Sequence, residues 1–308
     1  MIKQKKFLIP IIIIYVILVS VLVITAVYPA LDYSISEFLT SGGSVTYTIG
    51  NIFEIYIEPV TLLPMCFVFA AAGVCALRWE HKKVAGRILG TLSLICGEVF
   101  AQQMLHRIIK YYSRLTDISK PWIYPEGPLF SDKLWVKIAC AAVGAVIMVV
   151  FVLLARKIEQ KYLMKALKVM IVCMICLFGE LATIEGLKLL FGRMRYRYWI
   201  STNDAFWPWY RLNGKPASDG YKSFPSGHTA NSFVVMSLTF FFDAFGKKKA
   251  GDIARIGALC WVIFAMTTRI MAGAHFLSDV AAGFLVSFTI LVVSAAFMFK
   301  NGVGREEK

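Results

Sequence analysis

Lys188-Leu-Leu-Phe-Gly-Arg-Met-Arg195 is the first of three short polar segments that interrupt an otherwise very apolar sequence. The second is Phe224-Pro-Ser-Gly-His228, and the third is Thr268-Arg-Ile-Met-Ala-Gly-Ala-His275-Phe-Leu-Ser-Asp279. The apolar runs around them are about twenty residues long, enough for a helix to cross a bilayer core of about 30 Å. We therefore predict an all-α fold, a polytopic transmembrane helix bundle that holds the three polar segments together.

The composition also favours a membrane protein. Of the 308 residues, 58% are hydrophobic and 17% are charged, whereas a soluble domain is closer to half apolar. The net charge of +14 would suit nucleic acid, but the basic residues cluster in short segments between apolar runs, as the positive-inside rule expects. We expect the lipid bilayer as a partner, no nucleic acid, and both termini in the cytoplasm; the sequence does not indicate an oligomeric state.

The cysteines do not indicate a metal or redox site. All seven lie inside apolar runs, where free cysteine behaves as a small hydrophobic residue. Cys173 and Cys176 have the spacing of a metal or redox pair, but a second ligand pair is missing. A glycine-rich loop ending in Lys-Ser or Lys-Thr, which would cradle a nucleotide phosphate, is missing from the sequence too.

The apolar runs predict about eight helices, with seven spans as the alternative if one early run lies in the interface. Residues 29–58 contain no Lys or Arg, which favours an outer loop, and Pro59 would then lie in the first turn of the second helix. Residues 107–133 and 191–222 are expected outside as well. The predicted helices cover residues 7–28, 59–77, 88–106, 134–155, 169–190, 226–245, 256–273 and 275–299.

The first two polar segments suit an anion. Lys188 and Arg195 are seven residues apart, so in a continuing helix they face one side about 10 Å apart. They could equally extend to lipid headgroups. Ser226 and Gly227 would offer first-turn N–H groups with no partner inside the helix, where an anion is favoured. His228 titrates near neutral pH and could transfer a proton, or the segment could be a capping turn with an interfacial His.

The third segment pairs a histidine with a carboxylate. His275 and Asp279 are four residues apart and share one helix face. A carboxylate there can accept a hydrogen bond from one ring nitrogen and leave the other nitrogen as a nucleophile. The planar guanidinium group of Arg269 has two N–H donors that match two phosphate oxygens. The alternative is a salt bridge that closes two helices. Because ionisable groups near a bilayer are costly, three such segments together indicate a functional site.

The pattern Lys-x6-Arg, then Pro-Ser-Gly-His, then Arg-x5-His-x3-Asp resembles the type 2 phosphatidic acid phosphatase (PAP2) and haloperoxidase superfamily, and in particular its membrane lipid phosphatases. The resemblance covers about residues 86–300 and takes in six core helices. Two positions depart from it. Tyr196 stands where the family usually has Pro, and Thr268 stands where it usually has Ser.

The resemblance implies a role for each motif residue. His275 would attack phosphorus and form a phosphohistidine, Asp279 would orient it, and His228 would protonate the leaving oxygen and then activate water. No metal or other cofactor is implied. The residues that would hold the phosphoryl oxygens are Lys188, Arg195, Ser226, Gly227 and Arg269. The neighbouring Arg193 and Arg197 are expected to contact headgroups.

We therefore expect an integral membrane phosphatase that hydrolyses a lipid phosphate or diphosphate at the outer face of the cell membrane. The alternatives are a lipid phosphotransferase that uses the same phosphohistidine and a non-catalytic lipid-binding or transport protein. Three parts of the chain are predicted: an additional N-terminal transmembrane hairpin over residues 1–85, a PAP2-like domain over residues 86–300, and a cytoplasmic tail over residues 301–308.

Overall fold

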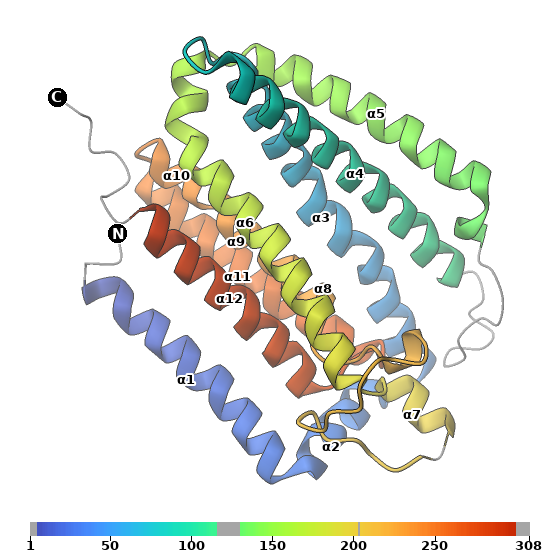
Figure 1. The fold of residues 1–308 in the computed structure, drawn as a ribbon. Coiled ribbons are helices and arrows are strands. Elements are labelled where there is room, and N and C mark those ends of the chain that lie inside the picture. The colour runs from blue at the N-terminus through green and yellow to red at the C-terminus, as the bar shows by residue number, and fades with distance from the viewer. Residues whose placement is uncertain (1–4, 116–129, 203, 300–308) are drawn as a thin grey trace.

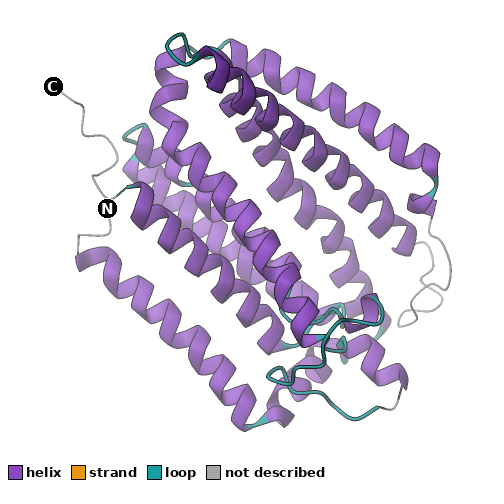
Figure 2. Cartoon of the chain, viewed as in Figure 1, coloured by secondary structure: helices purple, strands orange, loops and turns teal. Residues whose placement is uncertain are grey.

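A computed structural model describes residues 5–115, 130–202 and 204–299 (Figure 1). Within these ranges the chain is made of helices and loops and forms no strand (Figure 2), so the predicted all-α bundle is confirmed. The predicted tail, residues 301–308, and residues 116–129 of a predicted outer segment lie outside the described ranges.

In the described part of the chain, seven helices are long and apolar enough to cross a membrane. Seven shorter helical segments connect or cover them. The long helices are α1 (Lys5–Val27), α3 (Ser44–Leu77), α4 (Lys83–Leu115), α5 (Leu134–Arg156), α6 (Gln160–Phe191), α11 (Lys248–Met271) and α12 (Leu277–Met298). The short segments are α2 (Pro29–Thr40), η1 (Phe130–Asp132), α7 (Tyr196–Thr202), η2 (Asp219–Tyr221), α8 (Gly227–Phe233), α9 (Val235–Leu238) and α10 (Phe240–Ala244).

The helix predicted over residues 226–245 is present as α8, α9 and α10 in succession. The two residues between them, Val234 and Thr239, keep right-handed helical backbone angles. Their N–H groups bond to Asn231 and Met236, three residues back instead of four. The helix is therefore tightened at two points and none of its pieces alone has the length of a span.

The prediction that residues 29–58 form a loop is wrong, because most of them are helical. Residues 29–40 form α2, and α3 begins at Ser44 and continues through Pro59 and Pro64. Prolines are tolerated inside membrane helices because neighbouring groups satisfy the freed backbone carbonyls. The segment supplies carboxylates that pair with basic residues elsewhere in the bundle.

Helix α4 also extends beyond the predicted end at residue 106. It continues to Leu115, so Arg107, Lys110 and Tyr111 lie on a helix and not in the segment that connects two helices. Both corrections have the same result: α3 and α4 carry polar side chains into the end of the bundle where the three polar segments lie.

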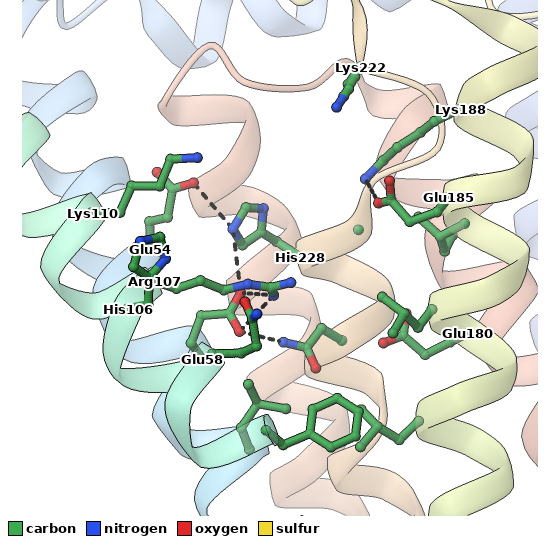
Figure 3. A pocket seen from close by; sticks show the side chains of 18 of the residues that line it. Glu54, Glu58, His106, Arg107, Lys110, Glu180, Glu185, Lys188, Lys222 and His228 are labelled. Carbon is green, nitrogen blue, oxygen red and sulfur yellow. Dashed lines mark hydrogen bonds and ion pairs between the residues drawn. The ribbon is translucent and has the colours of Figure 1, made fainter. Parts of the chain in front are cut away.

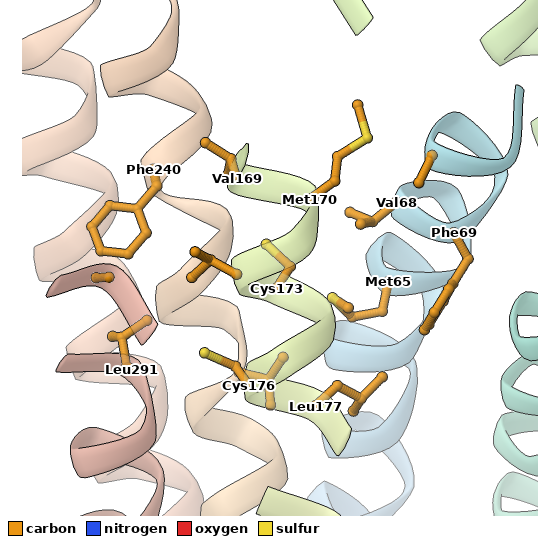
Figure 4. Close-up of a cluster of buried hydrophobic side chains, with 14 of the residues drawn as sticks. Met65, Val68, Phe69, Val169, Met170, Cys173, Cys176, Leu177, Phe240 and Leu291 are labelled. Atoms are coloured by element: carbon orange, nitrogen blue, oxygen red, sulfur yellow. The ribbon is translucent and has the colours of Figure 1, made fainter. Parts of the chain in front are cut away.

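Helix α3 lies in the middle of the bundle, against α4, α5, α6, α8 and α11. Its residues Met65 and Phe69 join Met170, Cys173 and Leu177 of α6 in the main apolar core (Figure 4). Helix α1, by contrast, packs mainly on α12 and α2. The boundary predicted at residue 85 stays a prediction, but α3 is packed into the helices on both sides of it. The cysteines are all free thiols.

Gly50 marks the closest approach of α3 to the end of α11. A Cβ added there would lie 2.6 Å from the Ala272 backbone nitrogen and 2.8 Å from the Thr268 carbonyl oxygen. The Gly50 carbonyl accepts a hydrogen bond from Arg269 at the same contact. A side chain at residue 50 would therefore push apart two helices that position the polar end of the bundle.

We predict that Gly50→Ala lowers the free energy of unfolding by about 1–3 kcal/mol, the usual effect of overpacking. Thermal unfolding of the detergent-solubilised protein measures this as a lower Tm. Gly186→Ala is the matched control, because a Cβ added there meets nothing within 4 Å and Ala is the better helix former. Equal Tm values for the two variants would contradict the close contact between α3 and α11.

Candidate active site

A cavity of about 710 Å³ is lined by residues that include Asp219 of η2 and Gly227 and His228 at the start of α8. Residues of α3, α4, α6 and α8 line it, and Figure 3 shows Lys188 of α6 and His228 of α8 in it together. Five of the eight predicted site residues line this cavity. They are Lys188, Arg195, Gly227, His228 and His275.

The other three predicted residues are buried but do not line the cavity. The Ser226 hydroxyl caps α8, because its oxygen accepts from the Thr229 backbone N–H at 3.4 Å and from the Thr229 hydroxyl at 3.0 Å. The Ser226 N–H donates to the Asp279 carbonyl at 2.9 Å. Ser226 therefore fixes where α8 begins, and this places the Gly227 backbone beside the Lys188 ammonium group.

His275 is held mainly by a backbone carbonyl. Its Nδ1 lies 2.7 Å from the Ser223 carbonyl oxygen and 3.7 Å from Asp279 Oδ2. A separation of 3.7 Å is too long for a hydrogen bond, and a carbonyl can only accept. Nδ1 therefore carries the hydrogen, and in the neutral ring the lone pair is on Nε2.

Asp279 organises the surroundings of His275 and does not bond to the ring directly. One oxygen, Oδ2, accepts from the Phe276 N–H at 2.8 Å and from the Ser223 hydroxyl at 2.5 Å. It thereby fixes both the residue whose carbonyl holds His275 and the first turn of α12. The other oxygen, Oδ1, pairs with Arg193 Nη1 at 2.6 Å.

The predicted headgroup contact of Arg193 is wrong, because its side chain is fully buried. Besides Asp279, its guanidinium binds Asp32 Oδ2 of α2 at 2.8 Å, and it lies 4.2 Å from the centre of the Phe276 ring. The turn that buries it is made by Gly192, which ends α6 in the left-handed conformation at φ 47° and sends the chain inward. Arg197 is buried as well.

His228 is contacted by side chains from α3 and α4. Its Nε2 lies 3.0 Å from the Tyr111 hydroxyl and 3.2 Å from Glu54 Oε1. Glu58, one turn further along α3, is 3.8 Å away. These three residues were missed from the sequence. The four-residue spacing of the two glutamates would have placed them on one face if residues 44–77 had been read as one helix.

Arg269 is oriented toward α3. It is fully buried, its Nη1 lies 3.0 Å from Glu54 Oε1, and its Nη2 donates to the Gly50 carbonyl. Glu58 has its own partners, because it accepts from Arg107 at 3.0 Å and from Asn231 at 3.1 Å. Both glutamates are therefore bound to cations of other helices.

The two departures from the family pattern fit their surroundings. Tyr196 is the first residue of α7, a position at which Pro is tolerated because its N–H needs no partner inside the helix. Its ring packs edge-on against Phe276, with centroids 5.8 Å apart. The Thr268 hydroxyl donates to the Ala265 carbonyl at 2.9 Å, within α11. Neither side chain lines the cavity.

Comparison with known proteins supports the resemblance over this region. A family model of the PAP2 superfamily matches residues 162–302, which confirms the predicted resemblance there. The match contains all three polar segments but excludes α3, which supplies Glu54 and Glu58. No match was found among curated proteins or among solved structures. The PAP2 domain indicates a phosphatase, and the apolar helices fit a membrane protein.

The charge state of His275 follows from its burial. Burial lowers the pKa of the His275 imidazole from 6.5 to about 4, because desolvation disfavours the charged ring. The ring is therefore neutral from about pH 4 upward, with Nε2 free of a proton. Below that pH, Nε2 takes up a proton and its lone pair is no longer available.

We predict that phosphatase activity does not decline as the pH falls through 6.5, and that it is lost only near pH 4, where His275 becomes protonated. Below the pKa the rate should fall about tenfold per pH unit. Single-turnover kinetics with a rapid pH jump measure this, and circular dichroism at each pH verifies that the protein is folded. An acidic limb centred near 6.5 would contradict the buried, neutral His275.

Proposed function

We propose that the protein is an integral membrane phosphatase that hydrolyses a lipid phosphate or diphosphate monoester through a phosphohistidine. The observation that carries this proposal is the meeting of two histidines and two cations, Lys188 and Arg195, in one cavity. One histidine, His275, has its Nδ1 hydrogen bound to a carbonyl. Its Nε2 is thus available for attack on phosphorus.

In the first step, Nε2 of His275 forms a bond to phosphorus and the bond from phosphorus to the leaving oxygen breaks. His228 gives that oxygen its proton, so a lipid alcohol leaves, or a lipid monophosphate if the substrate is a diphosphate. In the second step, His228 takes a proton from water, and the hydroxide attacks the phosphohistidine. Inorganic phosphate and free His275 result.

The phosphoryl oxygens are held by charges and dipoles already present in the cavity. Lys188, Arg195 and the first-turn amide of Gly227 would stabilise the charge that develops on these oxygens. Ser226 and Arg269 would support the phosphate site without contacting the phosphate. Ser226 fixes the start of α8, and Arg269 pairs with Glu54. The proposal requires no metal. Among the described residues, no group of three His, Cys, Asp or Glu side chains is placed to hold one.

The cavity walls support a lipid substrate. Ile95 and Val99 of α4 and Phe178 and Leu181 of α6 line the cavity and are also 37–54% exposed on the surface of the bundle. We infer that the cavity opens between α4 and α6, on a surface that would face the bilayer. The apolar chain of a lipid could lie in this opening while its phosphate reaches Lys188. A water-soluble phosphate ester would not need such an apolar opening.

The distribution of charge supports an active site on the outer face and termini in the cytoplasm. The connections between α3 and α4, between α5 and α6, and between α10 and α11 all contain Lys or Arg. They lie together at the end of the bundle opposite the cavity (Figure 1). The positive-inside rule assigns that end to the cytoplasm.

We predict that His275→Ala lowers phosphate release by about 10³-fold or more, because it removes the nucleophile. The assay uses purified protein in detergent micelles with phosphatidate, phosphatidylglycerophosphate and a polyprenyl diphosphate, without an added lipid acceptor. His81→Ala is the control, because His81 is an exposed histidine outside the cavity. The wild type should also form an acid-labile, base-stable phosphoprotein.

Retention of the wild-type rate by His275→Ala would show that His275 is not the nucleophile. Phosphate release that depends on an added lipid alcohol would instead support the phosphotransferase. A wild-type protein that releases no phosphate from any of the lipids would support a binding or transport protein.

A further inference from the structure

The candidate acid, His228, is held by a carboxylate from outside the PAP2 match. Glu54 belongs to α3, whereas the match covers residues 162–302. Its Oε1 lies 3.2 Å from His228 Nε2, and the glutamate is only 3% exposed. This contact joins a helix of the N-terminal region to the chemistry of the cavity.

The contacts of His228 indicate which of its nitrogens transfers a proton. Its Nε2 is hydrogen-bonded with the Tyr111 hydroxyl at 3.0 Å and lies 3.2 Å from Glu54 Oε1. Because a carboxylate can only accept, this ion pair favours a hydrogen on Nε2. Nδ1 is then the nitrogen that exchanges a proton with a bound substrate. His275 has the opposite arrangement, with Nδ1 bound to a carbonyl and Nε2 available. The two rings would thus present different nitrogens to one phosphoryl group.

We propose that Glu54 is a positioning residue that holds the Nε2–H group of His228, so that the proton given to the leaving oxygen departs from Nδ1. This inference rests on the proposed function. The imidazolium form of His228 gives its Nδ1 proton to the lipid oxygen and becomes a neutral ring whose Nε2 still lies beside Glu54. In the second step the proton of the attacking water returns to Nδ1, so the cycle closes.

The other neighbours of Glu54 are consistent with this role. Arg269 Nη1 lies 3.0 Å from the same oxygen, so a buried cation balances the carboxylate before and after the proton leaves His228. Tyr111 lies 3.0 Å from the same nitrogen of His228 and further restricts the ring. Glu58 is 3.8 Å from that nitrogen and is bonded to Arg107 and Asn231 instead.

The test is the dependence of the rate on the leaving group. Decyl phosphate has an alcohol leaving group that needs a proton, whereas a decyl-substituted nitrophenyl phosphate releases a stable phenolate without one. Glu54→Gln should slow single turnover of decyl phosphate by about 10²-fold and that of the nitrophenyl ester by less than about threefold, since general acid catalysis contributes only to the first. A merely structural role, including displacement of Arg269, would slow both esters by the same factor.

Glu58→Gln is the matched control, because it changes the neighbouring glutamate on the same face of α3. It should change the two rates by one common factor. If Glu54→Gln does not fold, as judged by thermal unfolding, Glu54→Asp keeps the charge beside Arg269 and withdraws the oxygen from His228. This variant should also slow decyl phosphate more than the nitrophenyl ester, but by a smaller factor than Glu54→Gln does.

Equal slowing of both esters by the Glu54 variant would overturn the inference and leave the proposed function intact. A wild-type protein that hydrolyses neither ester nor any lipid phosphate would overturn the proposed function, and this inference with it.

Discussion

The polar end of this bundle depends on one buried guanidinium. Arg193 lies between the carboxylates of Asp32 and Asp279, and all three side chains are at most 1% exposed. A charge taken out of water is tolerated only when its partners are close and well oriented. The arrangement therefore requires α2, the turn after α6 and the start of α12 to meet at one point, and this fixes the turn that carries His275.

A second buried arginine is also paired with a carboxylate of the N-terminal helices. Arg269 reaches α3 and pairs with Glu54, which in turn contacts His228. The acidic residues of α2 and α3 thus balance cations that belong to the PAP2 region. They also bring the N-terminal helices into the surroundings of both histidines, although the family match begins only at residue 162.

The sequence was sufficient for the helical bundle and for the five predicted residues that line the cavity, because helix length and motif spacing are local properties. It was insufficient for residues 29–58, because the partners of their acidic residues are distant in the chain. Asp32, for example, pairs with Arg193. The lack of Lys and Arg in this segment predicts a loop, whereas the structure shows helices that carry buried carboxylates. The burial of Arg193 depends on the left-handed turn at Gly192, and a Gly-Arg pair alone does not specify the direction of such a turn.

A double-mutant cycle between Asp32 and Arg193 tests most directly whether the N-terminal helices and the PAP2 region share one buried ionic contact. The free energy of unfolding would be measured for the wild type, Asp32→Asn, Arg193→Met and the double variant. Arg193→Met alone should cost about 3–5 kcal/mol, because it leaves two buried carboxylates without their cation. The double variant should cost less than the sum of the single variants by about 1–3 kcal/mol. Additivity within about 0.5 kcal/mol would show that the two residues are not coupled and would contradict this account of the fold.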